Sequence, residues 1–156
     1  MRPTITKPHH LFSLILIFVV TLARAGEPGF DQELANSFGA DEHGMKSYSF
    51  VILKTGSVVV NDEQEKQDLM RGHLENITRL ADEGKLVVAG PFGKNDLNYR
   101  GLFILTTPST EEALALLKTD PAIAAGVFDT EVLPWYGAAA LGAYLEVQKK
   151  ITKTNP

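Results

Sequence analysis

One histidine of the chain, His73, lies where proton-transfer chemistry is plausible from the residue pattern alone. It falls within RGHLENITRL, residues 71–80, where apolar residues recur at the spacing of one buried helical stripe. An imidazole takes up and releases a proton near neutral pH, as abstraction of a proton next to a carbonyl or phenol requires. His73 is therefore a candidate general base or acid. A core histidine with one satisfied nitrogen is the alternative interpretation.

Five further residues could line a binding site. Arg100 precedes a predicted strand and could hold a substrate carboxylate or phenolate, although an arginine there is often only solvated. Gly90, Pro91 and Phe92 end another strand and could form a pocket wall, or simply a turn. Trp135 could shape an aromatic-binding cavity, or act as a hydrophobic plug. We predict substrate contacts for all five.

The sequence contains no pattern for a metal or a cofactor. His73 has no second histidine or carboxylate at ligand spacing. The chain has no Cys, which excludes disulfides, thiol catalysis and thiolate zinc sites. It also has no Gly-rich phosphate loop. We therefore expect neither a metal nor a cofactor.

The first 25 residues resemble an export signal. Arg2 and Lys7 precede an apolar run over 11–23, and Ala23-Arg24-Ala25 provides small residues for cleavage. We expect a signal peptide over 1–25 and an exported protein, periplasmic or secreted; an uncleaved anchor is the alternative. Without residues 1–25, three of the 15 basic residues are lost, and 12 basic and 19 acidic residues leave a charge of −7. We expect no nucleic-acid partner and no membrane association in the mature form.

Periodicity and turn signals predict a single domain after a flexible leader over 26–45. Asn61 or Asp62 can cap the first helix, which should end at Gly84. Ser109 and Glu112 form a capping-box pattern for a second helix. The expected elements are a strand at 46–53, that first helix, strands at 85–90 and 101–107, the second helix through 118, a helical turn at 120–126, a strand at 127–134, and a C-terminal helix and tail over 138–156.

This order of strand, helix, strand, strand, helix, strand predicts an α+β, ferredoxin-like βαββαβ fold with an antiparallel sheet and both helices on one face. The two middle strands, 86–89 and 102–105, are apolar on both alternating faces. Two helices cover only one of these faces, so the other needs a cover. A second copy of the chain is the first candidate, and the segment 136–150 is a partial alternative.

Two stretches, GHLENITRLADEGKLVVAGPFG and RGLFILTTPSTEEALALLKTDPAIAAGVFDTEVLPWYG, resemble the YCII-related domain in its helix His, its GKL..AGPF strand-loop, its DP...AG turn and its terminal PW. The resemblance covers residues 46–137. It implies a ferredoxin-like protomer that forms a dimeric α/β-barrel, a homodimer. It also implies an active-site His–Asp pair, which maps onto His73 and Asp120. One relative removes chloride from a chlorinated hydroxyquinone.

We therefore predict an exported, cofactor-independent lyase or isomerase acting on a small, weakly charged molecule with an apolar body. His73 would transfer the proton, and Asp120 would orient it. Asp120 precedes Pro121, so helix capping alone could explain it. The alternative function is a non-catalytic dimeric module for ligand binding or structure. From the sequence, His73→Leu should separate the two, since a catalytic histidine on an apolar stripe contributes little to stability.

Overall fold

The computed structural model describes residues 29–154. The predicted signal segment, residues 1–25, lies outside the described residues. The chain divides into two units, Met1–Phe30 and Asp31–Pro156, and the fold below is that of the second unit. Within the described residues, no helix is long and apolar enough to cross a membrane.

The elements follow the predicted order, with one additional helix at the start. They are α1 (Gln32–Phe38), β1 (Met45–Thr55), α2 (Glu63–Asp82), β2 (Leu86–Pro91), β3 (Tyr99–Leu105), α3 (Thr110–Leu117), α4 (Pro121–Ala124), β4 (Phe128–Ala138), the 3-10 helix η1 (Ala139–Tyr144) and α5 (Leu145–Ile151).

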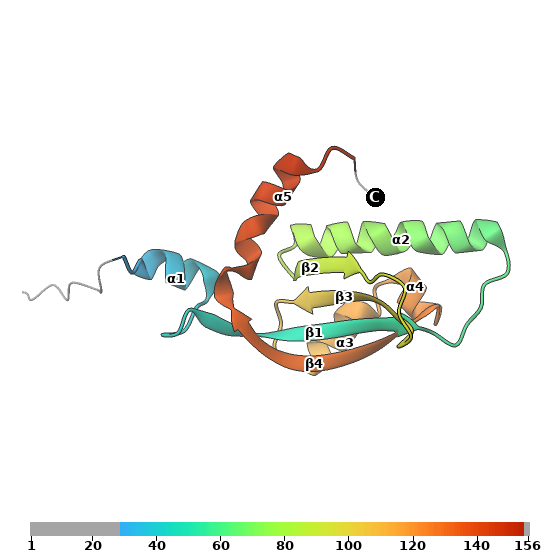
Figure 1. Ribbon diagram of the computed structural model, residues 1–156, viewed down its shortest axis with the longest axis horizontal. Coiled ribbons are helices and arrows are strands. Elements are labelled where there is room, and N and C mark those ends of the chain that lie inside the picture. Colours follow the sequence, from blue (N-terminus) through green and yellow to red (C-terminus); the bar gives the residue numbers. More distant parts are fainter. Residues whose placement is uncertain (1–28, 155–156) are drawn as a thin grey trace, which may run out of the picture. The chain divides into compact units, whose positions relative to one another are not determined.

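The four strands form one antiparallel sheet in the order β2-β3-β1-β4 (Figure 1). This is the strand order of a ferredoxin-like fold, so the predicted fold class is confirmed. β1 pairs with β4 along its whole length, from Met45 opposite Ala138 to Thr55 opposite Phe128. The C-terminal ends of β1 and β2 and the start of β3 and β4 therefore meet at one end of the sheet, the end that α4 adjoins in Figure 1.

Local capping signals set the helix ends close to their predicted positions. The Asp62 carboxylate accepts the backbone N–H of Glu65 at 2.8 Å and starts α2. After α2, Gly84 takes a φ of 68°, a left-handed conformation that glycine adopts without strain. At α3, the Ser109 hydroxyl accepts the Glu112 N–H, but the Glu112 carboxylate accepts the Thr107 hydroxyl instead of closing a capping box.

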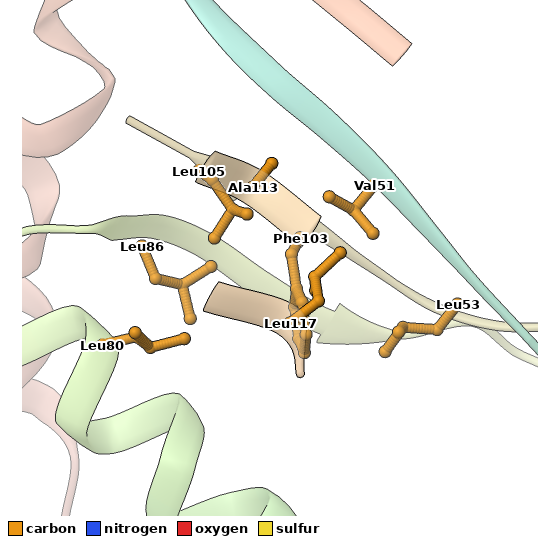
Figure 2. Packing of buried hydrophobic residues seen from close by; sticks show 8 residues of the cluster. All are labelled: Val51, Leu53, Leu80, Leu86, Phe103, Leu105, Ala113 and Leu117. Carbon is orange, nitrogen blue, oxygen red and sulfur yellow. The ribbon is translucent and has the colours of Figure 1, made fainter. Parts of the chain in front are cut away.

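Helices α2 and α3 cover one face of the sheet, called here the helix-covered face. Figure 2 shows Leu86 of β2 and Phe103 of β3 directed toward Leu80 of α2 and Leu117 of α3. All four side chains are nearly or fully buried. Burial of a side chain of this size stabilises the fold by about 1.5–3 kcal/mol relative to its exposed state, so this layer fixes α2 against the sheet.

The opposite face is covered only in part. Tyr48 and Ile104 are buried there, with Leu141 of η1 and Leu145 of α5 packed against the same cluster. The Tyr144 hydroxyl also donates a hydrogen bond to the backbone carbonyl of Val87. The C-terminal segment is thus the partial cover that the sequence offered as an alternative.

Two predictions about elements are wrong. Within the leader predicted to be flexible, residues 32–38 form α1, because the Asp31 carboxylate caps its start and Gly39 ends it in a left-handed conformation. The last strand also continues past Pro134 to Ala138. β4 is an edge strand, so the missing N–H of Pro134 does not end the pairing with β1.

Candidate active site

His73 lies on the face of α2 that packs on the sheet, and it is 7% exposed. Its ring centroid is 5.9 Å from that of Phe103 and 5.1 Å from that of Phe128. Phe103 comes from the centre of the sheet and Phe128 from the start of β4. The imidazole therefore packs against two aromatic rings, in surroundings that exclude most water.

Asp120 is the hydrogen-bond partner of His73. Its side chain is 0% exposed, and its Oδ2 atom lies 2.7 Å from Nδ1 of His73. The other carboxylate oxygen accepts the backbone N–H groups of Ala122 at 3.0 Å and Ile123 at 3.2 Å, which caps α4. The two interpretations of Asp120, helix cap and histidine partner, are thus both realised by one carboxylate.

The partners of Asp120 determine the protonation pattern of the pair. Both backbone N–H groups are donors, and the amide nitrogen of Asn76 is a further donor, 3.5 Å from Oδ2. An ionised carboxylate, which only accepts hydrogen bonds, suits this environment. Nδ1 of His73 must then carry the proton that it donates, and the second nitrogen, Nε2, carries the lone pair in the neutral ring.

Nε2 of His73 is open to an outside partner. It makes no hydrogen bond within residues 29–154. In this part of the chain every fully buried side-chain nitrogen or oxygen has a hydrogen-bond partner, so an atom without a partner is not fully buried. Nε2 therefore retains some contact with solvent. The basic nitrogen of the pair is the accessible one.

Close packing of α2 on α4 brings the pair together. A Cβ atom at Gly72 would lie 2.6 Å from Cγ of Pro121, nearer than side-chain atoms approach. Glycine at this position lets the two helices touch. His73 directly follows Gly72 on α2, and Asp120 directly precedes Pro121, the first residue of α4. The absence of one side chain thus permits the 2.7 Å contact beside it.

A polar network holds the pair from the α2 side. Besides donating toward Asp120, Asn76 accepts hydrogen bonds through its side-chain oxygen from Arg79 at 2.7 Å and from the Thr119 hydroxyl at 3.0 Å. Arg79 also donates to Thr119 at 2.8 Å. Asn76 is 7% exposed, so these bonds fix the orientation of its amide group.

A cavity of about 340 Å³ shares one residue, Phe128, with the surroundings of His73. Its walls come from the first half of α2, the loop after β1, the start of β3 and the start of β4. Phe128 lines this cavity and also contacts His73. His73 itself is not a lining residue, so the Phe128 ring is the shared wall between cavity and imidazole.

The chain matches the model of the YCII-related domain over residues 49–136, more than half of its length. It belongs to the YCII-related domain family. The family resemblance read from the sequence is thereby confirmed.

A solved structure of 5-chloro-2-hydroxyhydroquinone dehydrochlorinase from Burkholderia phenoliruptrix AC1100, in complex with 2,5-dihydroxybenzoquinone, is similar to this YCII-related chain. The two are 26% identical, the likeness covers 56% of this chain and 92% of the other, and the TM-score is 0.40. A comparison with curated proteins gives no match.

The YCII-related fold brings together some of the predicted site residues and separates others. His73 and Asp120 are in contact, and Arg100 lines the neighbouring cavity. The substrate contacts predicted for Gly90, Pro91 and Phe92 do not involve this cavity: these residues end β2 and begin the loop after it, and the Phe92 ring packs near Tyr99.

Trp135 is also separated from the pair. It packs against Tyr48, with ring centroids 5.6 Å apart, on the sheet face opposite His73. The direction of a strand residue depends on its register, and the strand runs further than its sequence signals predicted. Trp135 therefore does not contribute to the site around His73, and a substrate contact elsewhere stays a prediction.

No group of three or more His, Cys, Asp or Glu side chains within residues 29–154 is arranged to hold a metal ion. What the site of this YCII-related protein offers is one basic nitrogen oriented by a carboxylate, beside an apolar cavity. Asn76 and Phe128 could not be identified from the sequence, because their roles depend on contacts between distant elements. A glycine in the middle of a long helix was the one available signal for Gly72.

Proposed function

We propose that this YCII-related protein is a cofactor-independent lyase or isomerase of small organic molecules, with His73 as the proton-transfer residue. The observation that carries the proposal is the 2.7 Å contact between Nδ1 of His73 and Oδ2 of Asp120. It leaves Nε2 as the basic and accessible nitrogen. A buried carboxylate that also caps a helix holds the imidazole in this orientation.

In such a reaction, Nε2 of His73 removes a proton from a carbon or hydroxyl group next to a carbonyl. The ring becomes an imidazolium ion, and the negative charge of Asp120 stabilises it. Return of the proton to a different atom gives an isomer, whereas loss of a leaving group from the substrate anion gives a lyase product. No covalent bond to the protein forms in either case.

One observation favours a second function, a binding module without turnover. His73 does not line the 340 Å³ cavity, because Phe128 lies at the wall between them. A ligand could occupy this cavity without reaching Nε2. Catalysis requires the reacting atom to pass Phe128 or to approach Nε2 from another side.

Deuterium incorporation distinguishes the two functions. A thermal-shift screen of small phenols, quinones and lactones supplies ligands, and each ligand is then incubated with the protein in D₂O. An enzyme of the proposed kind exchanges protons next to the carbonyl, and His73→Gln should slow this exchange by about 10²–10⁴-fold. Exchange that is equally fast in His73→Gln rules out His73 as the base.

His43→Gln is the matched control for this experiment. His43 is exposed and lies before β1, and within residues 29–154 the exposed Glu42 is its one ion-pair partner. Its replacement removes one imidazole without touching the site, so the exchange rate should stay unchanged. Binding without exchange in the unmodified protein supports the binding module.

A homodimer through the partly covered sheet face is part of the proposal. On β1, Phe50 lies opposite Leu133 of β4 on one side and Ile104 of β3 on the other. Ile52, also on β1, lies opposite Leu102 of β3. Phe50, Ile52 and Leu102 are half-buried, while Leu133 is 42% exposed. Contiguous apolar surface of this kind is characteristic of subunit interfaces.

Export to the periplasm or the medium completes the proposal and rests on the sequence of residues 1–25. Mass spectrometry of the protein recovered from its native compartment tests it. A mature chain that starts at Gly26 is the expected result. A full-length chain in the cytoplasm would contradict export.

A further inference from the structure

The cavity beside the His73–Asp120 pair has mostly apolar walls. Val59 of the loop after β1, Leu69 and Met70 of α2, and Phe128 of β4 contribute side chains to it. The loop is fixed in place, since Gly56 donates its N–H to the Val127 carbonyl at 2.9 Å and Val58 donates to the Gly126 carbonyl at 3.1 Å. The cavity is thus built by a backbone that is tied to the start of β4.

Two cations line this apolar space, Arg100 from β3 and Lys66 from α2. The lining residues include no Asp or Glu among the part of the chain that the structure describes. Arg100 makes neither an ion pair nor a side-chain hydrogen bond within residues 29–154. Lys66 lies 3.8 Å from Glu63, but both side chains are largely exposed, and such pairs are weak.

This local charge is opposite to that of the whole chain, which has a formal charge of −4. Apolar walls that include two cations suit a ligand that has an apolar body and one anionic end. A volume of about 340 Å³ is near the lower limit for small-molecule sites, so the body is compact. A carboxylate matches the planar fork of an arginine and is fully ionised at neutral pH, unlike most phenols.

We propose that this cavity binds a compact monocarboxylate, such as a single-ring acid, with Arg100 and Lys66 holding the carboxylate. The apolar body then rests against Leu69, Met70 and Phe128. Since Phe128 also contacts His73, the part of the ligand that rests against Phe128 is nearest to the imidazole. The position of the ligand next to His73 would make a monocarboxylate the substrate class of the proposed enzyme, and this part rests on the proposed function. The binding site itself does not rest on that function.

Three probes test the site by calorimetric titration: benzoate, the uncharged benzamide of the same shape, and acetate, which has the charge without the body. Benzoate should bind at least about tenfold more tightly than either, as expected for a charge-assisted contact combined with burial of a ring. Equal binding of benzamide would overturn the role of the cations. Equal binding of acetate, or no binding of benzoate at millimolar concentration, would overturn the proposed site.

Arg100→Gln should weaken benzoate binding by about tenfold and leave benzamide binding unchanged. Lys66→Gln should have a smaller effect, because Lys66 is 58% exposed and has Glu63 as a competing partner. Arg71→Gln is the matched control, because it also replaces an arginine by glutamine and removes one positive charge. Arg71 lies on α2, pairs with Asp68 and does not line the cavity. An equal loss of affinity in Arg71→Gln would reduce the effect to net charge and overturn the proposal.

Amide chemical-shift changes on adding benzoate should fall on the loop after β1, on Leu69 and on Phe128; changes confined to other regions would overturn the location. His73→Gln should retain benzoate binding within about twofold, since the carboxylate contacts are elsewhere. This separates the two proposals. If benzoate binds but no ligand from the thermal-shift screen exchanges protons, the binding site stands and the catalytic function is ruled out. If such a ligand exchanges protons but benzoate does not bind, the catalytic function stands and the binding site is ruled out.

Discussion

On the helix-covered face of the sheet Phe103 is 2% exposed, whereas Leu133 on the opposite face is 42% exposed. Both faces are built from apolar side chains of the same strands. The first is covered by α2 and α3 along its length, and the second only by the short segment from Ala139 to Ile151. Alternation in the sequence therefore shows that both faces require a cover, but not which cover each receives.

The two faces also differ in their polar content. The helix-covered face contains the buried carboxylate of Asp120 with His73 and Asn76, all in one hydrogen-bonded group. On the opposite face the charged side chains of Lys54, Asp129 and Glu131 form exposed ion pairs at the edge. A polar group inside the covered layer needs complete pairing, because an unpaired buried group is costly.

A charge placed on each face gives the largest expected difference. Phe103→Lys inserts an ammonium group into the sealed layer and should cost more than about 4 kcal/mol, enough to unfold most of the protein. Leu133→Lys should change the stability of the monomer by less than about 1 kcal/mol, since the site is already exposed. Urea denaturation measures both.

Sedimentation of the same two variants tests the proposed dimer. The unmodified protein should sediment as a dimer at micromolar concentration, and Leu133→Lys as a folded monomer. A dimer that persists in Leu133→Lys would show that the partly covered face is not the interface. Equal destabilisation by both substitutions would abolish the distinction between the faces.

His73→Leu should give the next largest effect, on the helix-covered face. The substitution leaves Asp120 buried without its closest partner, so the free energy of unfolding should fall by about 3–5 kcal/mol. This corrects the sequence-based expectation that loss of stability would count against catalysis, because the pair is energetically coupled whatever its function.

A double-mutant cycle measures this coupling. Asp120→Asn combined with His73→Leu should cost less than the sum of the two single changes, since the second removes a group that has already lost its partner. Thermal denaturation of the four proteins provides the numbers. Strict additivity would mean that the two side chains contribute independently, contrary to the 2.7 Å contact.

The smallest expected effect concerns the partial cover. Burial raises the pKa of the Tyr144 hydroxyl, which donates its hydrogen bond to the Val87 carbonyl. The neutral phenol is favoured in the folded state, so its stabilisation is fully present below about pH 10, the value for an unfolded tyrosine, and is lost as the pH rises through the folded pKa. Tyr144→Phe should cost about 0.5–1.5 kcal/mol at pH 8 and less at pH 11.

Tyr99→Phe is the control for this comparison, since the Tyr99 hydroxyl makes no hydrogen bond within residues 29–154. Urea denaturation of both variants and of the unmodified protein at the two pH values gives the differences. A cost of Tyr144→Phe that is the same at both pH values would show that the hydroxyl does not help to hold the C-terminal segment on the sheet.

Much of the fold could be predicted because its signals are local. Asp62, Ser109 and Gly84 act on neighbouring backbone groups, and the apolar stripe with His73 follows from helix periodicity. The helix α1 was missed because it has no apolar stripe and buries no residue. Its caps, Asp31 and Gly39, were present in the sequence but mark a helix only weakly without such a stripe.

The site was predictable only in part. The position of His73 came from periodicity, but the assignment of Asp120 to it came from the family resemblance, because 47 residues separate the two. The fit of Gly72 against Pro121, and the sharing of Phe128 between imidazole and cavity, depend on how α2, α4 and β4 pack. Sequence spacing contains no information about such distances between elements.

The long separation of His73 and Asp120 in the chain has a consequence for dissecting the protein. The exposed loop between β2 and β3, residues 92–98, lies between them in sequence. A single backbone cut after Lys94 would place the imidazole on one polypeptide and the carboxylate on the other. The two fragments would regain the pair only by reassociating through the β1–β4, β1–β3 and β2–β3 ladders. We therefore expect the protein to divide into two complementing fragments whose reassembly restores the site.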